Sequence, residues 1–244
     1  MRDPGQPGRF GDNAGTLQID FVKRGGWIGT TLAESFEPPI LDVHEKIEDR
    51  ARLTELLGPQ PLWDGYSNVA RYPRATEGTR RPDQVRIRPL WGRFMSWLAA
   101  TRKSEVVVEF GTAFGVSGMY WLAGLQMGHL FTFEPNRRWA EVARENLSAI
   151  SDRYTLTVDC FEAAAGSHLR PGSVDIAFVD AIHTSSFVLE QYRVLELYMR
   201  ERGLVLFDDI NFSADMEACW HIISRRPGIT ASARLNARVG IIEL

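Results

Sequence analysis

The chain has 244 residues, of which 44% are hydrophobic and 24% are charged, as in a soluble globular protein with one α/β domain and an additional segment. Its formal net charge of −3 argues against a general nucleic-acid-binding protein. No apolar run approaches the roughly 20 residues of a membrane span, and the first residues lack the apolar stretch of a signal peptide. We therefore expect neither a nucleic acid nor a membrane as partner.

The chain has two cysteines, Cys160 and Cys219, which lie far apart and outside any CxxC spacing. This usage predicts a reducing compartment, with the cytoplasm as the default location, and no structural zinc site.

Composition divides the chain into three parts. Residues 1–15 are rich in Gly, Pro, Asp and Asn and are expected to be flexible. Residues 16–102 form an N-terminal extension, in which we expect a helix over 41–57, a long loop over 61–85 and a helix over 86–101. Residues 103–244 are expected to form the main domain. The extension is predicted to act as a helical and loop cap on it.

Strands alternate with helices throughout the main domain, which is typical of a parallel sheet covered by helices. We expect strands at 105–109, 129–133, 155–158, 174–179 and 203–207, and helices at 117–127, 137–150, 186–201 and 213–225. Two late strands, at about 229–234 and 237–243, have no helix between them and are predicted to form an antiparallel pair joined near Asn236. The predicted fold is therefore α/β, with a mostly parallel sheet of seven strands and helices on both faces.

The segment 106–117 predicts a buried strand that leads through a glycine turn into a helix. A pyrophosphate site uses the free N–H groups and the positive end of such a helix. Here Glu109 places an anion at the end of the strand, and the spacing of Gly111 and Gly115 departs from GxGxxG. The segment therefore favours a ligand that carries a positive charge, such as an amine or a sulfonium, over a dinucleotide.

A second acidic residue, Glu134, follows the next predicted strand. Its carboxylate can accept hydrogen bonds from both hydroxyls of a ribose. Alternatively, Glu134 is a carboxylate at the start of a helix, with Pro135 at the first helical position.

Three carboxylates are predicted to meet where the strands 174–179 and 203–207 end: Asp180, Asp208 and Asp209. Like charges repel, so a cation among them is expected, and oxygen ligands favour Mg²⁺, or alternatively Ca²⁺ or Mn²⁺. The alternative keeps Asp180 beside the cofactor and makes the other two loop or cap carboxylates. His183 follows Asp180 by three residues, and its imidazole can accept a proton from a hydroxyl or hydrogen-bond to a substrate.

Over about residues 85–244, these features resemble class I S-adenosylmethionine-dependent methyltransferases. The resemblance implies a Rossmann-like sheet, with the glycine turn holding the methionine part of the cofactor and Glu134 holding its ribose. It also implies that Asp159 binds the adenine amino group and that Phe161 packs against the adenine ring, although Asp159 can equally cap the following helix. The implied cofactor-binding residues are Glu109, Gly111, Thr112, Ala113, Gly115, Ser117, Glu134, Asp159, Cys160, Phe161 and Asp180.

The acidic cluster is similar to that of the bacterial cation-dependent small-molecule O-methyltransferases, which include enzymes acting on sugars and macrolides. This resemblance implies that Asp180, Asp208 and Asp209 bind the cation, and that Asp180 and His183 are catalytic. In the catechol-type enzymes the last two ligands are Asp-Asn and a lysine stands in the position of His183. Here Asn211 is displaced from the ligand position by two residues. We expect methyl transfer to a hydroxyl of a small molecule.

Three alternatives stay open at this point: a metal-independent N- or O-methyltransferase, an NAD-binding oxidoreductase, and a non-catalytic module that binds S-adenosylmethionine. The methyl acceptor and the oligomeric state are also open, and the extension offers a surface for a second subunit. Aromatic residues that precede the main domain are candidates for a lid over a flat acceptor or, alternatively, for the hydrophobic core: Trp63, Tyr66, Tyr72 and Trp91.

Overall fold

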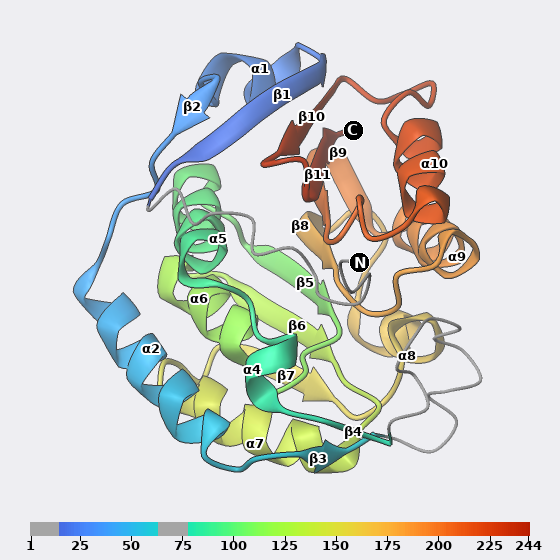
Figure 1. Ribbon diagram of the computed structural model, residues 1–244. Helices are drawn as coiled ribbons and strands as arrows, with labels where there is room; N and C mark the ends of the chain where they lie inside the picture. The colour runs from blue at the N-terminus through green and yellow to red at the C-terminus, as the bar shows by residue number, and fades with distance from the viewer. Residues whose placement is uncertain (1–14, 63–77) are drawn as a thin grey trace, which may run out of the picture.

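The computed structural model describes residues 15–62 and 78–244, and its centre is a nine-stranded sheet (Figure 1). The strand order is β2-β1-β10-β11-β9-β8-β5-β6-β7, and the five strands from β9 to β7 are parallel. The strands are β1 (Leu17–Lys23), β2 (Ser35–Phe36), β5 (Val106–Phe110), β6 (His129–Phe133), β7 (Tyr154–Thr157), β8 (Val174–Val179), β9 (Met199–Phe207), β10 (Ala231–Leu235) and β11 (Val239–Glu243). The predicted α/β fold, with its parallel strands and its late antiparallel pair, is confirmed.

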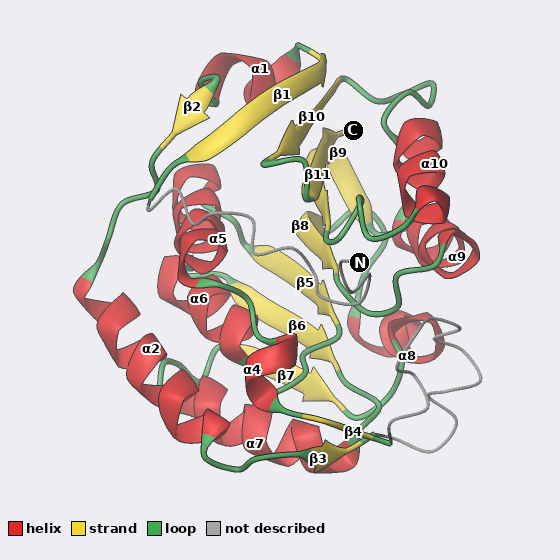
Figure 2. Cartoon of the chain, viewed as in Figure 1, coloured by secondary structure: helices red, strands yellow, loops and turns green. Residues whose placement is uncertain are grey.

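Helices cover both faces of this sheet (Figure 2). One group packs over β5 and β6 and shares a hydrophobic core with them: α2 (Asp42–Glu55), α5 (Pro89–Arg102), α6 (Val116–Gly124) and α7 (Arg137–Ser148). A second core lies on the opposite face, beneath α8 (Phe161–His168), α9 (Ser185–Leu195) and α10 (Ala214–Ile223). All six residues of β8 are buried, as expected for a central parallel strand with helices on both sides.

Local sequence explains where several of these helices begin. The α5 helix starts with Pro89, whose fixed backbone angle suits the first helical position. The Asn136 side chain accepts hydrogen bonds from the backbone N–H groups of Arg138 and Trp139 and so caps α7. Ser213 caps α10 in the same way through the N–H of Met216.

The sheet has two strands more than the seven predicted, because the N-terminal extension joins it. The β1 strand pairs antiparallel with β10, with Ile19 opposite Leu235, and β2 pairs with the other edge of β1. Apolar residues alternate with polar ones over the first part of β1, a strand pattern that the sequence analysis missed. This pairing covers the β10 edge, which would otherwise expose unpaired backbone groups.

The predicted long loop over 61–85 is partly structured. Residues 63–77 lie outside the described part of the chain, but β3 (Gln60–Pro61) pairs with β4 (Thr79–Arg80), and α4 (Pro82–Val85) follows. The helix predicted over 186–201 ends earlier, since residues 199–202 already belong to β9.

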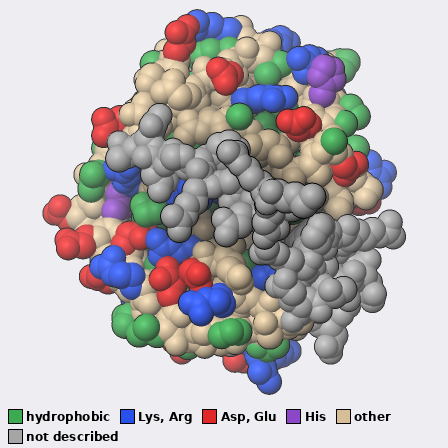
Figure 3. All heavy atoms as spheres, in the orientation of Figure 1, with side chains coloured by type: hydrophobic (Ala, Val, Ile, Leu, Met, Phe, Trp, Pro, Cys, Tyr) green, Lys and Arg blue, Asp and Glu red, His purple; other side chains and the backbone are tan. Residues whose placement is uncertain are grey.

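Acidic and basic side chains are interspersed on the face shown in Figure 3. Within residues 15–62 and 78–244, no helix has the length and apolar character needed to cross a membrane.

Candidate active site

The candidate site lies at the carboxyl ends of β5 and β8, where the chain order in the sheet reverses. From β5 the chain runs outward through β6 to β7, and it then returns to β8 on the other side of β5. Ligands of open parallel sheets bind at such a reversal. The two strand ends are close, since the Asp180 N–H donates to the Phe110 carbonyl at 3.2 Å. A Cβ atom on Gly111 would lie 2.1 Å from the Asp180 carbonyl oxygen, so only glycine fits this turn.

Glu109 is fully buried near the end of β5. Its Oε2 accepts a hydrogen bond from the Thr132 hydroxyl at 2.7 Å, whereas Oε1 has no partner among the described residues. Burial raises the pKa of Glu109 to about 7, although the hydroxyls of Ser117 and Thr132 oppose this rise. An acidic group with a buried, unpartnered oxygen fits a ligand that supplies a donor and a positive charge.

Glu134 joins the glycine turn to the turn that follows β6. Its Oε2 accepts from the Ala113 N–H and its Oε1 accepts from the Asn136 N–H, both at 2.8 Å. Glu134 is almost fully buried, which raises its pKa to about 7 against the effect of these two hydrogen bonds. The carboxylate is thus fixed beside the glycine turn, and each oxygen retains a second lone pair. Asn136 caps the following helix, whose first residue is Arg137, so Pro135 is not at the first helical position.

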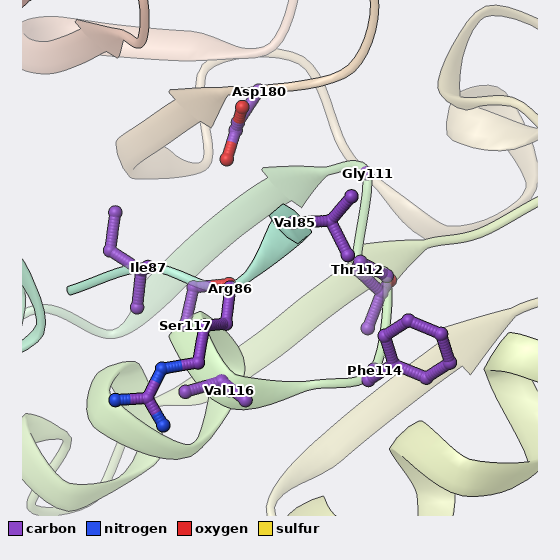
Figure 4. Close-up of a pocket in the computed structure, with 10 residues that line it drawn as sticks. Val85, Arg86, Ile87, Gly111, Thr112, Phe114, Val116, Ser117 and Asp180 are labelled. Carbon is purple, nitrogen blue, oxygen red and sulfur yellow. The ribbon is translucent and has the colours of Figure 1, made fainter. Parts of the chain in front are cut away.

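A cavity beside the glycine turn brings together five of the predicted cofactor-binding residues: Gly111, Thr112, Ala113, Ser117 and Asp180. Its other wall comes partly from the N-terminal extension, through Val85, Arg86 and Ile87 (Figure 4). The sequence analysis missed these three residues, because no motif marks them and only the packing of α4 brings them over the turn.

The N-terminal wall of the cavity is fixed to α2 by ion pairs. Arg86 pairs with Glu48 at 2.7 Å and with Glu55 at 3.0 Å, and all three side chains are largely buried. The Tyr120 hydroxyl donates to the second oxygen of Glu48 at 2.7 Å, which ties α2 to α6 as well.

The residues predicted to contact adenine lie at the start of α8. Phe161 is buried and stacks on Phe110, with ring centroids 3.9 Å apart, so its ring belongs to the core. The cause is its place as the first residue of α8, on the side of that helix that packs on the sheet. Asp159 lies just before α8 and accepts from the Cys160 N–H at 2.8 Å, without capping the helix.

The acidic cluster forms as predicted, with His183 in its middle. The His183 Nε2 atom lies 3.7 Å from Asp180 Oδ1 and 3.7 Å from Asp209 Oδ2, and its side chain is 15% exposed. Burial and the neighbouring carboxylates of Asp208 and Asp209 raise the pKa of Asp180 well above its usual range. A carboxyl group and an imidazole therefore stand together at the end of β8, beside the glycine turn.

The arrangement does not fit the divalent cation expected at Asp180, Asp208 and Asp209. Arg238 donates to both oxygens of Asp208, at 3.0 and 2.6 Å, and its Nε lies 2.9 Å from Asp209 Oδ1. Two of the three carboxylates thus already have a positively charged partner. Within the described ranges, no group of three or more His, Cys, Asp or Glu is arranged to hold a metal ion.

The predicted aromatic lid cannot be placed as a whole. Trp63, Tyr66 and Tyr72 lie outside the described residues. Trp91 is 5% exposed within α5 and packs in the hydrophobic core, so it is a core residue and the lid interpretation was wrong for it.

Known proteins were compared with the chain in sequence and in structure. Residues 108–210 match a family model described as a methyltransferase domain. A protein of Mycobacterium sp. strain KMS, provisionally named an O-methyltransferase, is 29% identical over 114 residues, which are 45% of this chain and 52% of that protein. The match thus spans about half the length of this curated relative.

Two solved structures show the same fold. The O-methyltransferase TomG from Streptomyces achromogenes, in complex with S-adenosylmethionine, is 20% identical with a TM-score of 0.56, over 84% of this chain and 99% of that one. An O-methyltransferase from Bacillus cereus, in complex with S-adenosylhomocysteine, is 15% identical with a TM-score of 0.56, over 89% and 96% of the two chains. The chain therefore resembles a methyltransferase domain over residues 108–210, and its strand order is that of the class I methyltransferase fold of these two structures.

Proposed function

We propose that this protein transfers a methyl group from S-adenosylmethionine to a hydroxyl of a small molecule. The observation that carries the proposal is the placement of Asp180 and His183 at the end of β8, next to the cavity formed by the glycine turn. The matched O-methyltransferases support the choice of oxygen as acceptor, two of them in complexes with S-adenosylmethionine or its product.

Two acidic residues around the glycine turn, outside the lining of the cavity, fit the cofactor. Bound there, it would supply an electrophilic methyl group on a positively charged sulfur. Glu109 offers a buried oxygen that has no partner among the described residues, which suits the amino group or the charge of the methionine part. Glu134, whose carboxylate is held by two backbone N–H groups, would accept hydrogen bonds from the ribose hydroxyls.

The remaining chemistry falls to side chains at the end of β8. As the acceptor oxygen bonds to the methyl carbon and the carbon–sulfur bond breaks, the acceptor hydroxyl must lose its proton. His183 can take this proton on its imidazole, and Asp180, at 3.7 Å, stabilises the positive charge that results. Most of the rate enhancement would come from holding the two reactants in line within a site that excludes water.

The test measures cofactor binding and turnover separately. Calorimetry with S-adenosylhomocysteine reports binding, and the formation of S-adenosylhomocysteine with a panel of phenols, catechols and sugars reports transfer. We expect His183→Ala to lower kcat by about 10²–10⁴-fold with little effect on binding. His221→Ala, on the exposed side of α10, is the matched control. If the wild-type protein binds NAD and not S-adenosylhomocysteine, the proposal fails.

A further inference from the structure

Arg238 enters the acidic cluster from the turn between β10 and β11. Its backbone N–H donates to the Leu235 carbonyl at 3.0 Å, and its backbone carbonyl accepts from the Ile210 backbone N–H at 2.9 Å. Asn236 and Ala237 make the turn with positive φ angles of 45° and 55°. The arginine backbone is therefore fixed both to its own hairpin and to the segment that follows β9.

The guanidinium of Arg238 donates one hydrogen bond to each carboxylate oxygen of Asp208 and also contacts Asp209. The Asp208 side chain is 3% exposed and that of Arg238 is 30% exposed, so the pair is well shielded from water. Bidentate, charge-assisted contacts of this kind are among the stronger polar interactions in proteins. Each Asp208 oxygen thereby accepts a hydrogen bond from the guanidinium.

The carboxylate oxygens that Arg238 does not contact face His183 instead. Asp180 Oδ1 and Asp209 Oδ2 each lie 3.7 Å from its Nε2 atom. One guanidinium and one imidazole thus lie among the three carboxylates. A divalent ion at Asp208 would have to displace the two hydrogen bonds from Arg238 and would then lie beside a permanent positive charge.

We propose that the guanidinium of Arg238 takes the place of a divalent cation in this site, holding Asp208 and Asp209 together without a metal. Arg238 is then a positioning residue, and the site carries its own cation as part of the fold. The consequence for catalysis rests on the proposed function, because it concerns the same edge of the sheet. Whether a metal ion binds to the cluster does not depend on the proposed function, since metal binding can be measured without a methyl acceptor.

The experiment measures Mn²⁺ binding to the full-length protein by electron paramagnetic resonance of the free ion. We expect wild-type protein to leave the free Mn²⁺ signal unchanged at concentrations where Arg238→Ala binds one equivalent, with affinity at least about tenfold higher. Adding Asp208→Asn to that variant is expected to abolish the new site. Arg226→Ala removes a different arginine–carboxylate pair, with Glu196, and should behave as wild type.

Two results would overturn the proposal. One is a wild-type protein that binds one Mn²⁺ and loses it in Asp208→Asn. The other is an Arg238→Ala variant that still binds S-adenosylhomocysteine and so is folded, but binds no Mn²⁺. The wild-type measurement alone keeps the proposal refutable if Arg238→Ala does not fold. A failure of the proposed function would appear separately, as absent S-adenosylhomocysteine binding or methyl transfer.

Discussion

Replacing Glu109 by glutamine is expected to stabilise the ligand-free protein at alkaline pH and to weaken cofactor binding. Burial raises the pKa of this carboxyl from 4.5 to about 7, so the folded protein holds its proton over a range where the unfolded chain has lost it. A carboxyl with a raised pKa therefore costs stability as pH rises from about 4.5 to about 7, and the cost is complete above that range.

The size of this effect follows from the two pKa values. Ionising Glu109 in the fold costs about 3 kcal/mol at pH 8 and less than about 1 kcal/mol at pH 5. Glutamine has no charge to desolvate, but its amide group introduces a buried donor that costs about 1–3 kcal/mol if it finds no acceptor. That second cost does not depend on pH. The gain from glutamine should therefore be about 2 kcal/mol larger at pH 8 than at pH 5.

Denaturant unfolding of both proteins at pH 5 and pH 8 measures this difference directly, with two-state behaviour checked first. Glu105→Gln, at an exposed position just before β5, is the matched control and should show no pH-dependent difference. Calorimetry with S-adenosylmethionine should show weaker binding to Glu109→Gln. A stability difference between Glu109→Gln and wild type that is the same at both pH values would refute the reasoning.

Three further predictions follow from the geometry. Gly111→Ala places a Cβ 2.1 Å from the Asp180 carbonyl oxygen at a φ of +82°, so we expect the free energy of unfolding to fall by about 2–4 kcal/mol and S-adenosylhomocysteine binding to be lost. Gly172→Ala, at a φ of +67° with open space around it, is the control and should lower the melting temperature less. Asp175→Ala removes the acceptor of two backbone N–H groups at the start of β5 and should lower the free energy of unfolding by about 2–4 kcal/mol, measured in urea. Treatment with EDTA should leave methyl transfer unchanged; activity that disappears and returns with Mg²⁺ would contradict the role given to Arg238.

Much of the fold could be predicted because its signals are local. Buried strands and amphipathic helices have periods that are visible in a few consecutive residues, and β6 and β8 lie where those periods predict them. Boundaries were less certain, as in β9, whose exposed first residues resemble the end of a helix. The β1 strand carries a short alternation of apolar and polar residues that the sequence analysis missed, and its pairing with β10, at the opposite end of the chain, has no local signal.

The residues of the candidate site also fall into those that the sequence placed correctly and those that it did not. The order of parallel strands places their carboxyl ends at one edge, so the sequence alone predicted that Asp180, Asp208 and Asp209 lie near one another. It could not assign Phe161 to the core, since an aromatic residue at a helix start can face either the sheet or a ligand.

What the sequence by itself determined is therefore an α/β sheet with a glycine turn and an acidic edge, because strand periodicity and strand ends are properties of neighbouring residues. Only the tertiary structure decided which cation neutralises that edge. Arg238 follows Asp208 by thirty residues and belongs to no motif. It reaches the carboxylates because the antiparallel pairing of β11 with β9 brings its turn beside them. A contact between distant segments depends on how the whole sheet is assembled, and no local pattern records it.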